Sequence, residues 1–583
     1  MAKIWRFSRH DEQQVRSLSN GLRISPLMAQ VLIARGYEST LQVQEFLEAK
    51  LVDLHPPELL PGLNEAAARI LSAVEDRRRV TIYGDYDADG VCATSILWHC
   101  LKLLGANVDY FIPSRLEEGY GLNTSAIREL HEADPERLLI SVDCGITSVE
   151  EARLAKELGL ELIITDHHQF GEALPEAAVL VHPRLPESDY PFGDLCGAAV
   201  AFKLAWRLCQ IKGDGKRATP QMREFLLSAM GLAALATITD VVPLHGENRL
   251  LVRFGLPALT ERPGCGMKAL LTLCELQNKP LLETDDVGFN IGPRINAAGR
   301  LGQARLAVEL LTTENENRAR ELAVYLNEMN EMRKKVERKI LKHAREMVDE
   351  QPEWLEAPAL VLASSEWHAG VIGIVAARVA EHYSKPTILI SMSEKSQIGQ
   401  GSGRTIANLN LHAALAGSAE FLETFGGHEA AAGLKIAADQ IDDFRAAFCN
   451  QIQQQLEGDR PEEELWIDAE VRLADCTMNA VKELDRLGPF GEKNPRPTFA
   501  ATRVELAEPP RKMGAGERHL SLTLHQYGKK LKAIAFGRGE WADEIARIEG
   551  PLSISFAVNI NNFRGQHSVQ LLLKDWKPEE VAS

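Results

Sequence analysis

Short apolar segments alternate with helix-like segments between residues 79 and 240, and this alternation constrains the fold more than any other feature of the chain. Strands that are apolar throughout are covered on both faces, and intervening helices make neighbouring strands parallel. We therefore predict a doubly wound α/β domain with a parallel sheet. Its expected strands are residues 80–83, 108–111, 138–142, 162–165 and 179–181, with helices over 91–104 and 147–158.

The rest of the chain divides into further modules, because 583 residues are too many for one hydrophobic core. Apolar residues at helical spacing in a highly charged region, 303–350, predict a long connecting helix, or equally one packed along a single domain. A second alternating segment predicts a smaller α/β domain, and short alternating strands predict an OB-like β-barrel. The expected architecture is multidomain α/β, with these boundaries: an N-terminal segment without an interpretable motif (1–55), the doubly wound domain (56–302), the helix (303–350), the smaller domain (351–455) and the barrel (460–583).

Composition excludes several protein classes. The chain is 45% hydrophobic and 25% charged, and no apolar stretch is expected to approach bilayer length, which excludes a membrane protein. The N-terminus has no apolar region of the kind that precedes secretory cleavage, so a cytoplasmic location is expected. Nine cysteines without a CxxC pair indicate neither a disulfide framework nor a thiolate zinc site.

Charge is unevenly distributed. The net charge of −17 is unfavourable for binding nucleic acid. Residues 511–538, however, contain seven basic residues against one acid, Glu517. This basic strip is either a nucleic-acid footprint or the solvated edge of a sheet.

Three carboxylates lie within five residues where the first strand gives way to a helix. They are Asp85, Asp87 and Asp89. Ligands of doubly wound sheets gather at the carboxyl ends of the strands. Ionised carboxylates this close together repel one another unless a cation lies between them, so a divalent metal ion is expected.

A calcium-binding EF-hand loop is the main competing interpretation, since aspartates at positions one, three and five and glycine at six fit it. Position twelve of the loop is Ile96, which is not a bidentate ligand. The segment before the loop is also strand-like instead of helical. The EF-hand interpretation is therefore rejected.

Acids and imidazoles follow the next strands as well. One strand ends at Asp143, and another ends at Asp166, His167 and His168. Asp240 ends an apolar helix-like run, a position at which aspartate is usually structural. Repetition at successive strand ends favours a metal site, and mixed carboxylate and imidazole ligands favour Mn²⁺ or Mg²⁺.

Four of these elements, in this order, resemble the motif series of the DHH phosphoesterases. They read DYDADG (85–90), VDCG (142–145), TDHH (165–168) and TDVVPL (239–244). GSGRT (401–405) and GGHEAAAG (426–433) are similar to elements of the accessory DHHA1 domain. The stretches PRINAAGR (293–300), WHAGVIG (367–373) and GPFGEKNP (488–495) resemble the RecJ exonucleases in particular.

The resemblance implies a two-metal exonuclease that degrades single-stranded DNA from 5′ to 3′ into 5′-mononucleotides, in DNA repair and recombination. It implies that Asp143 bridges two Mn²⁺ or Mg²⁺ ions and that His168 contacts the scissile phosphate. Family II pyrophosphatases have a histidine where Tyr83 stands here, and Asp85 is expected to replace it as a ligand. The implied metal ligands are Asp85, Asp87, Asp89, Asp143, His167 and Asp240, with the role of Asp166 left open.

Substrate-binding residues are also expected. Gly426, Gly427 and His428 are expected to precede a helix whose N–H groups approach a phosphate, although these small residues would equally serve tight packing. Arginine clamps a phosphate through two hydrogen bonds. The further candidates are Arg115, Arg294, Gly401, Ser402, Gly403 and Arg404.

The barrel with its basic strip suits a path for single-stranded DNA, with Phe536 or Phe563 as stacking platforms or core residues. A single-strand-binding protein and a RecQ-type helicase are partners that the family implies. One alternative is a DHH phosphodiesterase of short oligonucleotides or cyclic dinucleotides, which the extra C-terminal module disfavours. The other is a non-catalytic replication scaffold, which is disfavoured because such proteins lose metal ligands and this sequence retains them.

Overall fold

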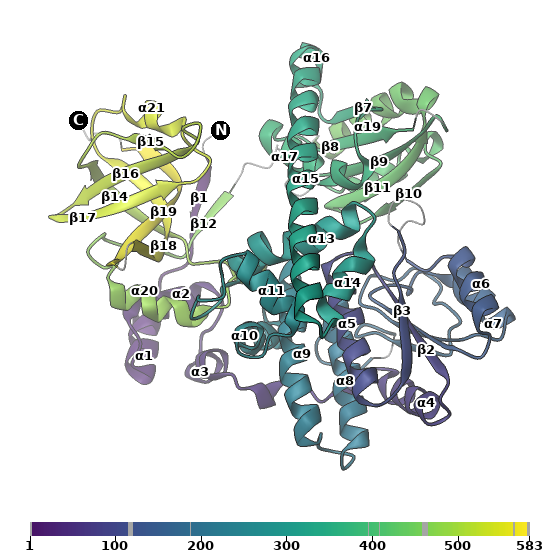
Figure 1. The fold of residues 1–583 in the computed structure, drawn as a ribbon. Helices are drawn as coiled ribbons and strands as arrows, with labels where there is room; N and C mark the ends of the chain where they lie inside the picture. Colours follow the sequence, from purple (N-terminus) through teal and green to yellow (C-terminus); the bar gives the residue numbers. More distant parts are fainter. Residues whose placement is uncertain are drawn as a thin grey trace. The chain divides into compact units, whose positions relative to one another are not determined.

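The computed structural model describes residues 3–114, 121–186, 188–393, 396–406, 409–456, 464–563 and 566–579. The chain forms two compact units (Figure 1). Unit 1 comprises Met1–Leu54, Pro243–His245 and Glu462–Ser583, and unit 2 comprises His55–Val242 and Gly246–Pro461.

Unit 2 contains the predicted parallel sheet. Its strand order is β3-β2-β4-β5-β6, and every neighbouring pair is parallel. The chain runs from β2 outward to β3 and then returns to β4 on the other side of β2, so the order reverses between β2 and β4. The doubly wound sheet is thus confirmed. The strands are β2 (Arg79–Gly84), β3 (Asn107–Phe111), β4 (Leu138–Val142), β5 (Glu161–Thr165) and β6 (Val179–Val181).

Helices surround this sheet. They are α4 (Leu63–Glu75), α5 (Ala88–Leu103), α6 (Thr124–Ala133), α7 (Val149–Glu157), α8 (Gly197–Lys212), α9 (Pro220–Thr239) and α10 (Gly246–Glu261). Within the described residues α9 is long and apolar enough to cross a membrane, so the expectation that no such stretch exists was wrong. Because α9 packs against α5, α8 and α10, its apolar side chains are those of a core helix.

A helical region follows. Its elements are α11 (Cys265–Leu273), α12 (Thr284–Asp286), the π-helix η3 (Val287–Ile291), α13 (Gly292–Arg300), α14 (Ala304–Thr312), α15 (Glu316–Asp349) and α16 (Pro352–Glu356). The predicted long helix is α15, but residues 303–350 do not form one helix. Thr313 is extended, and the side chain of Asn315 accepts hydrogen bonds from the N–H groups of Asn317 and Arg318, which starts a new helix.

A mixed five-stranded sheet forms the smaller α/β domain, as predicted. Its order is β10-β11-β9-β8-β7, and only β7 and β8 are parallel. Phe444 and Phe448 belong to one of its hydrophobic clusters and Val371 to another. The elements are β7 (Leu360–Ser364), α17 (Ala369–Tyr383), β8 (Thr387–Met392), β9 (Ile398–Arg404), α18 (Leu411–Ala416), β10 (Thr424–Gly427), β11 (Ala431–Ala437) and α19 (Ile441–Leu456).

Unit 1 contains the OB-like sheet. The strand order is β13-β14-β18-β19-β17-β16-β15, and a further pairing of β14 with β16 closes five of the strands into a ring. The predicted barrel is therefore confirmed. Its elements are β12 (Glu464–Ile467), β13 (Ala469–Glu470), α20 (Met478–Leu484), β14 (Phe499–Leu506), β15 (Arg511–Met513), β16 (His519–Gln526), β17 (Lys529–Ala535), α21 (Trp541–Ile545), β18 (Leu552–Phe563) and β19 (Gln566–Pro578).

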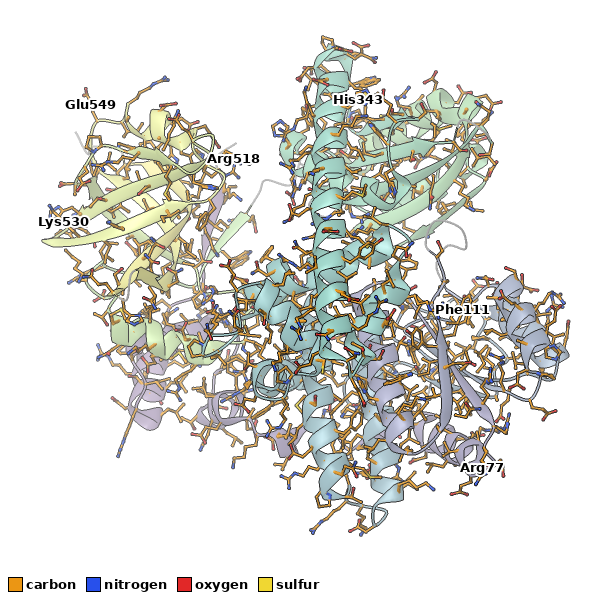
Figure 2. The ribbon with its side chains drawn as sticks, viewed as in Figure 1. Arg77, Phe111, His343, Arg518, Lys530 and Glu549 are labelled. Carbon is orange, nitrogen blue, oxygen red and sulfur yellow. The ribbon has the colours of Figure 1, made fainter. Side chains whose placement is uncertain are left out.

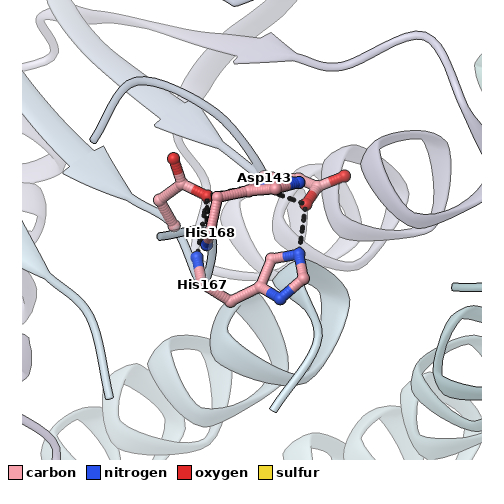
Figure 3. Close-up of side chains that lie close together, drawn as sticks. Asp143, His167 and His168 are labelled. Atoms are coloured by element: carbon pink, nitrogen blue, oxygen red, sulfur yellow. Dashed lines mark hydrogen bonds and ion pairs between the residues drawn. The ribbon is translucent and has the colours of Figure 1, made fainter. Parts of the chain in front are cut away.

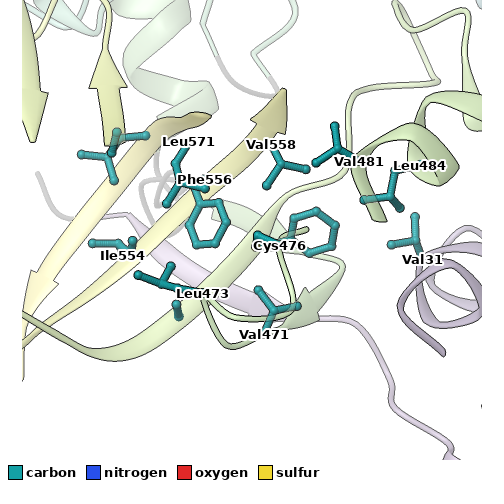
Figure 4. Close-up of a cluster of buried hydrophobic side chains, with 14 of the residues drawn as sticks. Val31, Val471, Leu473, Cys476, Val481, Leu484, Ile554, Phe556, Val558 and Leu571 are labelled. Atoms are coloured by element: carbon teal, nitrogen blue, oxygen red, sulfur yellow. The ribbon is translucent and has the colours of Figure 1, made fainter. Parts of the chain in front are cut away.

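The N-terminal segment belongs to the same unit as this barrel. It forms β1 (Ile4–Phe7), α1 (Glu12–Leu22), α2 (Pro26–Ala34) and α3 (Thr40–Glu48). β1 pairs with β12 in parallel, and Trp5 donates a hydrogen bond from Nε1 to Oδ2 of Asp575 at 2.8 Å. Val31 of α2 lies in one hydrophobic cluster with Val481 and Phe556 (Figure 4). This segment therefore completes the core of unit 1.

Candidate metal centre

The acidic residues of unit 2 meet at one edge of the parallel sheet. Asp85 directly follows β2, Asp143 follows β4 and Asp166 follows β5, and these three strands are neighbours. Parallel strands place their carboxyl ends at the same edge. The three strand ends that the sequence singled out are thus brought together beside the point where the strand order reverses.

Two further aspartates are fixed by helix N-termini. Asp87 caps α5, with Oδ1 accepting hydrogen bonds from the N–H groups of Asp89 and Gly90 at 2.9 and 3.1 Å. Asp89 is 1% exposed and accepts the N–H groups of Gly197 and Ala198, at the start of α8, at 2.7 Å each. The positive end of a helix dipole stabilises a buried carboxylate in this position.

Asp143 lies against the start of α8. Its backbone has a φ of 62°, which is unusual for a residue other than glycine, and its side chain is 2% exposed. A Cβ atom on residue 197 would lie 2.4 Å from Oδ1 of Asp143. Only glycine fits at position 197, and it was not among the sequence candidates.

His167 lies at the centre of the cluster. Its Nε2 is 3.2 Å from Oδ1 of Asp143 (Figure 3). The same nitrogen is 3.7 Å from carboxylate oxygens of Asp89 and Asp240. Within the described residues this buried nitrogen has no hydrogen-bond partner. Burial, followed by the charge of His168, lowers the pKa of His167 to about 4, so the imidazole is neutral at pH 7. A neutral, buried imidazole among carboxylates suits a metal ligand.

His168 has a different environment. Its Nδ1 is 2.8 Å from Oδ1 of Asp166, which also accepts the backbone N–H groups of both histidines, while Oδ2 accepts that of Ile146. Burial lowers the pKa of His168, but the hydrogen bond to Asp166 and the negative charges of Asp166, Asp240 and Asp89 together outweigh this and raise it to about 9. The imidazolium is 33% exposed. Asp166 therefore orients a positively charged His168.

The remaining carboxylates repel one another. Burial raises the pKa values of Asp89, Asp143 and Asp240, and neighbouring carboxylates raise those of Asp143 and Asp240 further. Such groups hold their charge when a cation lies among them.

The ligand atoms fall into three sets, within each of which all atoms lie within 4.8 Å of one another. Asp143 belongs to two of the sets, and so does His167. Carboxylate oxygens with one imidazole suit Mn²⁺ and Mg²⁺, so the donor chemistry fits a pair of such ions. The sets are Asp85, Asp87 and Asp143; Asp89, His167 and Asp240; and Asp143, Asp166, His167 and His168.

The segment η3–α13 supports two of the metal-bearing elements. Oδ1 of Asn296 accepts a hydrogen bond from the N–H of Ala88, between Asp87 and Asp89, at 2.8 Å. A Cβ atom on Gly292 would lie 2.3 Å from Cγ2 of Thr239, the residue before Asp240. Sequence reasoning assigned no role to Asn296, although its position in the motif PRINAAGR was a signal.

Among the described residues, the expected substrate-binding residues lie on α13 and in the mixed sheet. Arg115 falls outside the described residues, and so does the side chain of Phe563. Arg294 on α13 donates hydrogen bonds to Oδ1 of Asn327 and to the carbonyl of Asn290. Gly401, Ser402, Gly403 and Arg404 lie on β9 of the mixed sheet, where Arg404 Nη1 donates to the carbonyl of Gly403 at 2.7 Å.

The prediction that Gly426, Gly427 and His428 precede a helix was wrong. The two glycines end β10, and His428 lies in the turn that leads into β11. Gly427 pairs with Ala432, and the N–H of His428 donates to the carbonyl of Ala431 at 2.8 Å, so the backbone closes a hairpin. These residues therefore do not supply a helix N-terminus to a phosphate.

The basic residues of the strip lie on β15 and β17 of unit 1 and in the loops at Arg518 and Arg538; Figure 2 labels Arg518 and Lys530. Lys512 pairs with Asp543 at 2.7 Å, and Arg511 pairs with Glu508 at 3.2 Å. Lys529, Lys530 and Lys532 on β17 form no ion pair within the described residues. This strand therefore carries three of the strip's basic residues whose charge no ion pair offsets in the described part of the chain.

Comparisons with known families assign these modules. Residues 79–231 match the DHH family, N-terminal domain, residues 356–454 match the DHHA1 domain, and residues 467–575 match the RecJ OB domain. The single-stranded-DNA-specific exonuclease RecJ of Bacillus subtilis is 38% identical over 578 residues, which cover 98% of this chain and 70% of that protein. The chain belongs to the RecJ family.

Solved RecJ structures agree with this assignment. RecJ of Thermus thermophilus in complex with Mn²⁺ superposes with a TM-score of 0.83 at 31% identity, covering 99% of this chain and 80% of that one. The same protein in complex with Mg²⁺ gives a TM-score of 0.76 at 29% identity, covering 99% and 79%. RecJ relatives thus bind both ions that the donor set of this chain favours.

Proposed function

We propose that this chain is a two-metal exonuclease that hydrolyses single-stranded DNA from its 5′ end and releases 5′-mononucleotides. One observation carries the proposal. The chain belongs to the RecJ family, and its sets of carboxylate and imidazole ligands lie where the strand order of the parallel sheet reverses. Asp143 belongs to two of these sets, and His167 also belongs to two. The alternative scaffold function would not require this ligand set to be complete.

Two groups of residues would hold the ions. Asp85, Asp87 and Asp143 form one group, and Asp89, His167 and Asp240 form the other, with Asp143 reaching both. When bound, two divalent ions lower the pKa of a shared water and stabilise charge on the attacking and leaving oxygens of a phosphodiester. The helix starts and strand ends fix the ligands before the ions bind.

His168 is proposed to contact the scissile phosphate. Asp166 engages Nδ1 and thereby orients the imidazolium, whose side chain is 33% exposed. A donor fixed in advance stabilises negative charge as it develops on the phosphoryl oxygens. This role requires the proton to stay on His168, which the hydrogen bond to Asp166 favours because it raises the pKa of His168.

The barrel is proposed to bind the single strand along β17. Lys530 and Lys532 are exposed and lie on the same face of the strand, about 7 Å apart. Phe536, the residue after β17, is 65% exposed and offers a platform for a base. In the mixed sheet, Ser402 and Arg404 are proposed to bind phosphate.

Digestion of end-labelled DNA tests the proposal. A long single strand labelled at either end is incubated with Mn²⁺, Mg²⁺ or EDTA, using wild type, Asp143→Ala and Asp443→Ala. Asp443 is an exposed residue of α19 and serves as the matched control. We expect metal-dependent mononucleotide release from the 5′ end by wild type and the control, and none by Asp143→Ala.

Other outcomes would redirect the assignment. Cleavage of di- to tetranucleotides without degradation of long DNA would favour a phosphodiesterase of short oligonucleotides. Release from the 3′ end would contradict the proposed polarity. No cleavage of any substrate would favour the scaffold.

A further inference from the structure

Arg184 is bound to the turn that carries both histidines of the metal centre. It lies three residues after the end of β6. Its Nη2 donates a hydrogen bond to the carbonyl oxygen of His167 at 2.8 Å, and its backbone N–H donates to Nδ1 of His182 at 3.0 Å. The guanidinium is therefore hydrogen-bonded to the backbone of His167, a candidate metal ligand.

His182 completes this attachment. Because its Nδ1 accepts a hydrogen bond from an N–H group, the neutral ring carries its proton on Nε2. That Nε2 is 2.8 Å from the carbonyl oxygen of His168, to which it donates. The carbonyls of both metal-centre histidines are thus held by side chains from one short segment, residues 182–184.

The side chain of Arg184 is nevertheless exposed to solvent. Its stem is fixed by the backbone, since a Cβ atom on Gly193 would lie 2.9 Å from Cγ of Arg184. No carboxylate forms an ion pair with Arg184 among the residues that the structure describes. A guanidinium carries five N–H donors, and the bond to His167 uses one of them. The others are available to a ligand.

The metal centre opens toward partly exposed groups. His168 and Asp240 are 33% and 22% exposed, whereas Asp89, Asp143 and Asp166 are at most 2% exposed. The cluster contains more carboxylate charge than two divalent cations neutralise, so a DNA phosphate approaching it requires additional positive charge. An exposed arginine that is hydrogen-bonded to the turn carrying His167 and His168 provides that charge in a geometry suited to phosphate.

We propose that Arg184 binds a phosphate of the DNA strand beside the metal centre. This inference rests on the proposed function, because it takes the anion to be a phosphate of single-stranded DNA. It assigns a second role to the segment 182–184, which fixes the histidines of the centre and also contacts the substrate.

The salt dependence of DNA cleavage tests the proposal. For single strands, each phosphate contact contributes about −0.7 to the slope of the logarithm of the DNA association constant against log salt concentration. Because kcat/KM includes this binding step, its slope is expected to follow. We expect Arg184→Gln to make this slope shallower by about 0.7 and to raise KM, and Arg184→Lys to retain most of the slope. The control is Arg223→Gln, an exposed arginine on α9 about 25 Å along the helix from Asp240, which should leave the slope unchanged.

Two further measurements separate the possible failures. The Mn²⁺-induced rise in melting temperature of Arg184→Gln shows whether His167 is still in place. If Arg184→Gln leaves both the Mn²⁺-induced rise in melting temperature and the salt slope unchanged, the proposal is overturned. If the variant loses the rise but keeps the salt slope, the proposal is also overturned, because Arg184 would then only position the histidines.

Failure of the proposed function looks different. Wild type would then not degrade DNA, and binding of a labelled oligonucleotide in EDTA replaces cleavage as the readout. A shallower salt slope of binding in Arg184→Gln would still support the phosphate site, and an identical slope would refute it.

Discussion

Gly197 is the first residue of α8, and the Asp143 side chain occupies the space that a side chain at position 197 would need. A Cβ atom there would lie 2.4 Å from Oδ1 and 2.5 Å from Cβ of Asp143. These separations are about 1 Å shorter than an ordinary non-bonded contact. Gly197→Ala must therefore displace the Asp143 carboxylate or the first turn of α8, whose N–H groups bind Asp89.

The cost follows from this displacement. Overpacking a close-packed site destabilises a protein by about 1–3 kcal/mol. A misplacement of catalytic groups by about 1 Å slows an enzyme about 100-fold. We expect Gly197→Ala to lose about 1–3 kcal/mol of unfolding free energy and about 100-fold in kcat/KM, with a smaller Mn²⁺-induced rise in melting temperature.

Urea unfolding, metal-induced thermal shift and DNA cleavage measure these three quantities. Gly264→Ala is the matched control, because Gly264 precedes helix α11 and a Cβ atom there would meet nothing within 4 Å. Its unfolding free energy should change by less than about 1 kcal/mol, with normal cleavage. Wild-type cleavage and metal stabilisation in Gly197→Ala would refute the packing argument.

Three further variants test other parts of the account. His168→Gln should slow cleavage about 100- to 1,000-fold, because it removes an oriented hydrogen-bond donor. The variant should keep the Mn²⁺-induced rise in melting temperature, because the metal ligands remain. Loss of that rise would show that His168 is a ligand. The double variant Lys530→Gln, Lys532→Gln should make the salt slope of DNA binding shallower by about 1.4. Lys512→Gln should change this slope less, because Lys512 is paired with Asp543. A change of the same size in both variants would argue against a DNA path along β17. Lys203→Met leaves Glu247 buried without its cation and should cost about 3–5 kcal/mol in urea unfolding; a cost below about 1 kcal/mol would show that the pair contributes little.

The sequence predicted the parts of the centre that strands deliver. Apolar segments ending in Asp85, Asp143 and Asp166 could be recognised because the carboxyl ends of parallel strands share one edge. Two contacts could not be predicted, namely Asp89 at the start of α8 and Gly197 against Asp143. They join residues more than fifty positions apart and depend on how α8 packs, which no local pattern encodes.

Other differences have local causes. Gly426 and Gly427 suit either a helix start or a hairpin, and pairing with β11 selects the hairpin. The break before α15 depends on Asn315 capping a new helix within a region of continuous helical periodicity. The N-terminal segment showed no motif because its role is to pack α2 and pair β1 within unit 1, which is a tertiary property.

The central claim is that Asp143 links two divalent ions. Anomalous scattering from crystals grown with Mn²⁺ tests it most directly, because each bound ion gives its own peak. We expect two peaks within the cluster, one beside Asp85 and Asp87 and one beside His167 and Asp240, with Asp143 contacting both. A single peak, or two peaks of which Asp143 contacts only one, would contradict it.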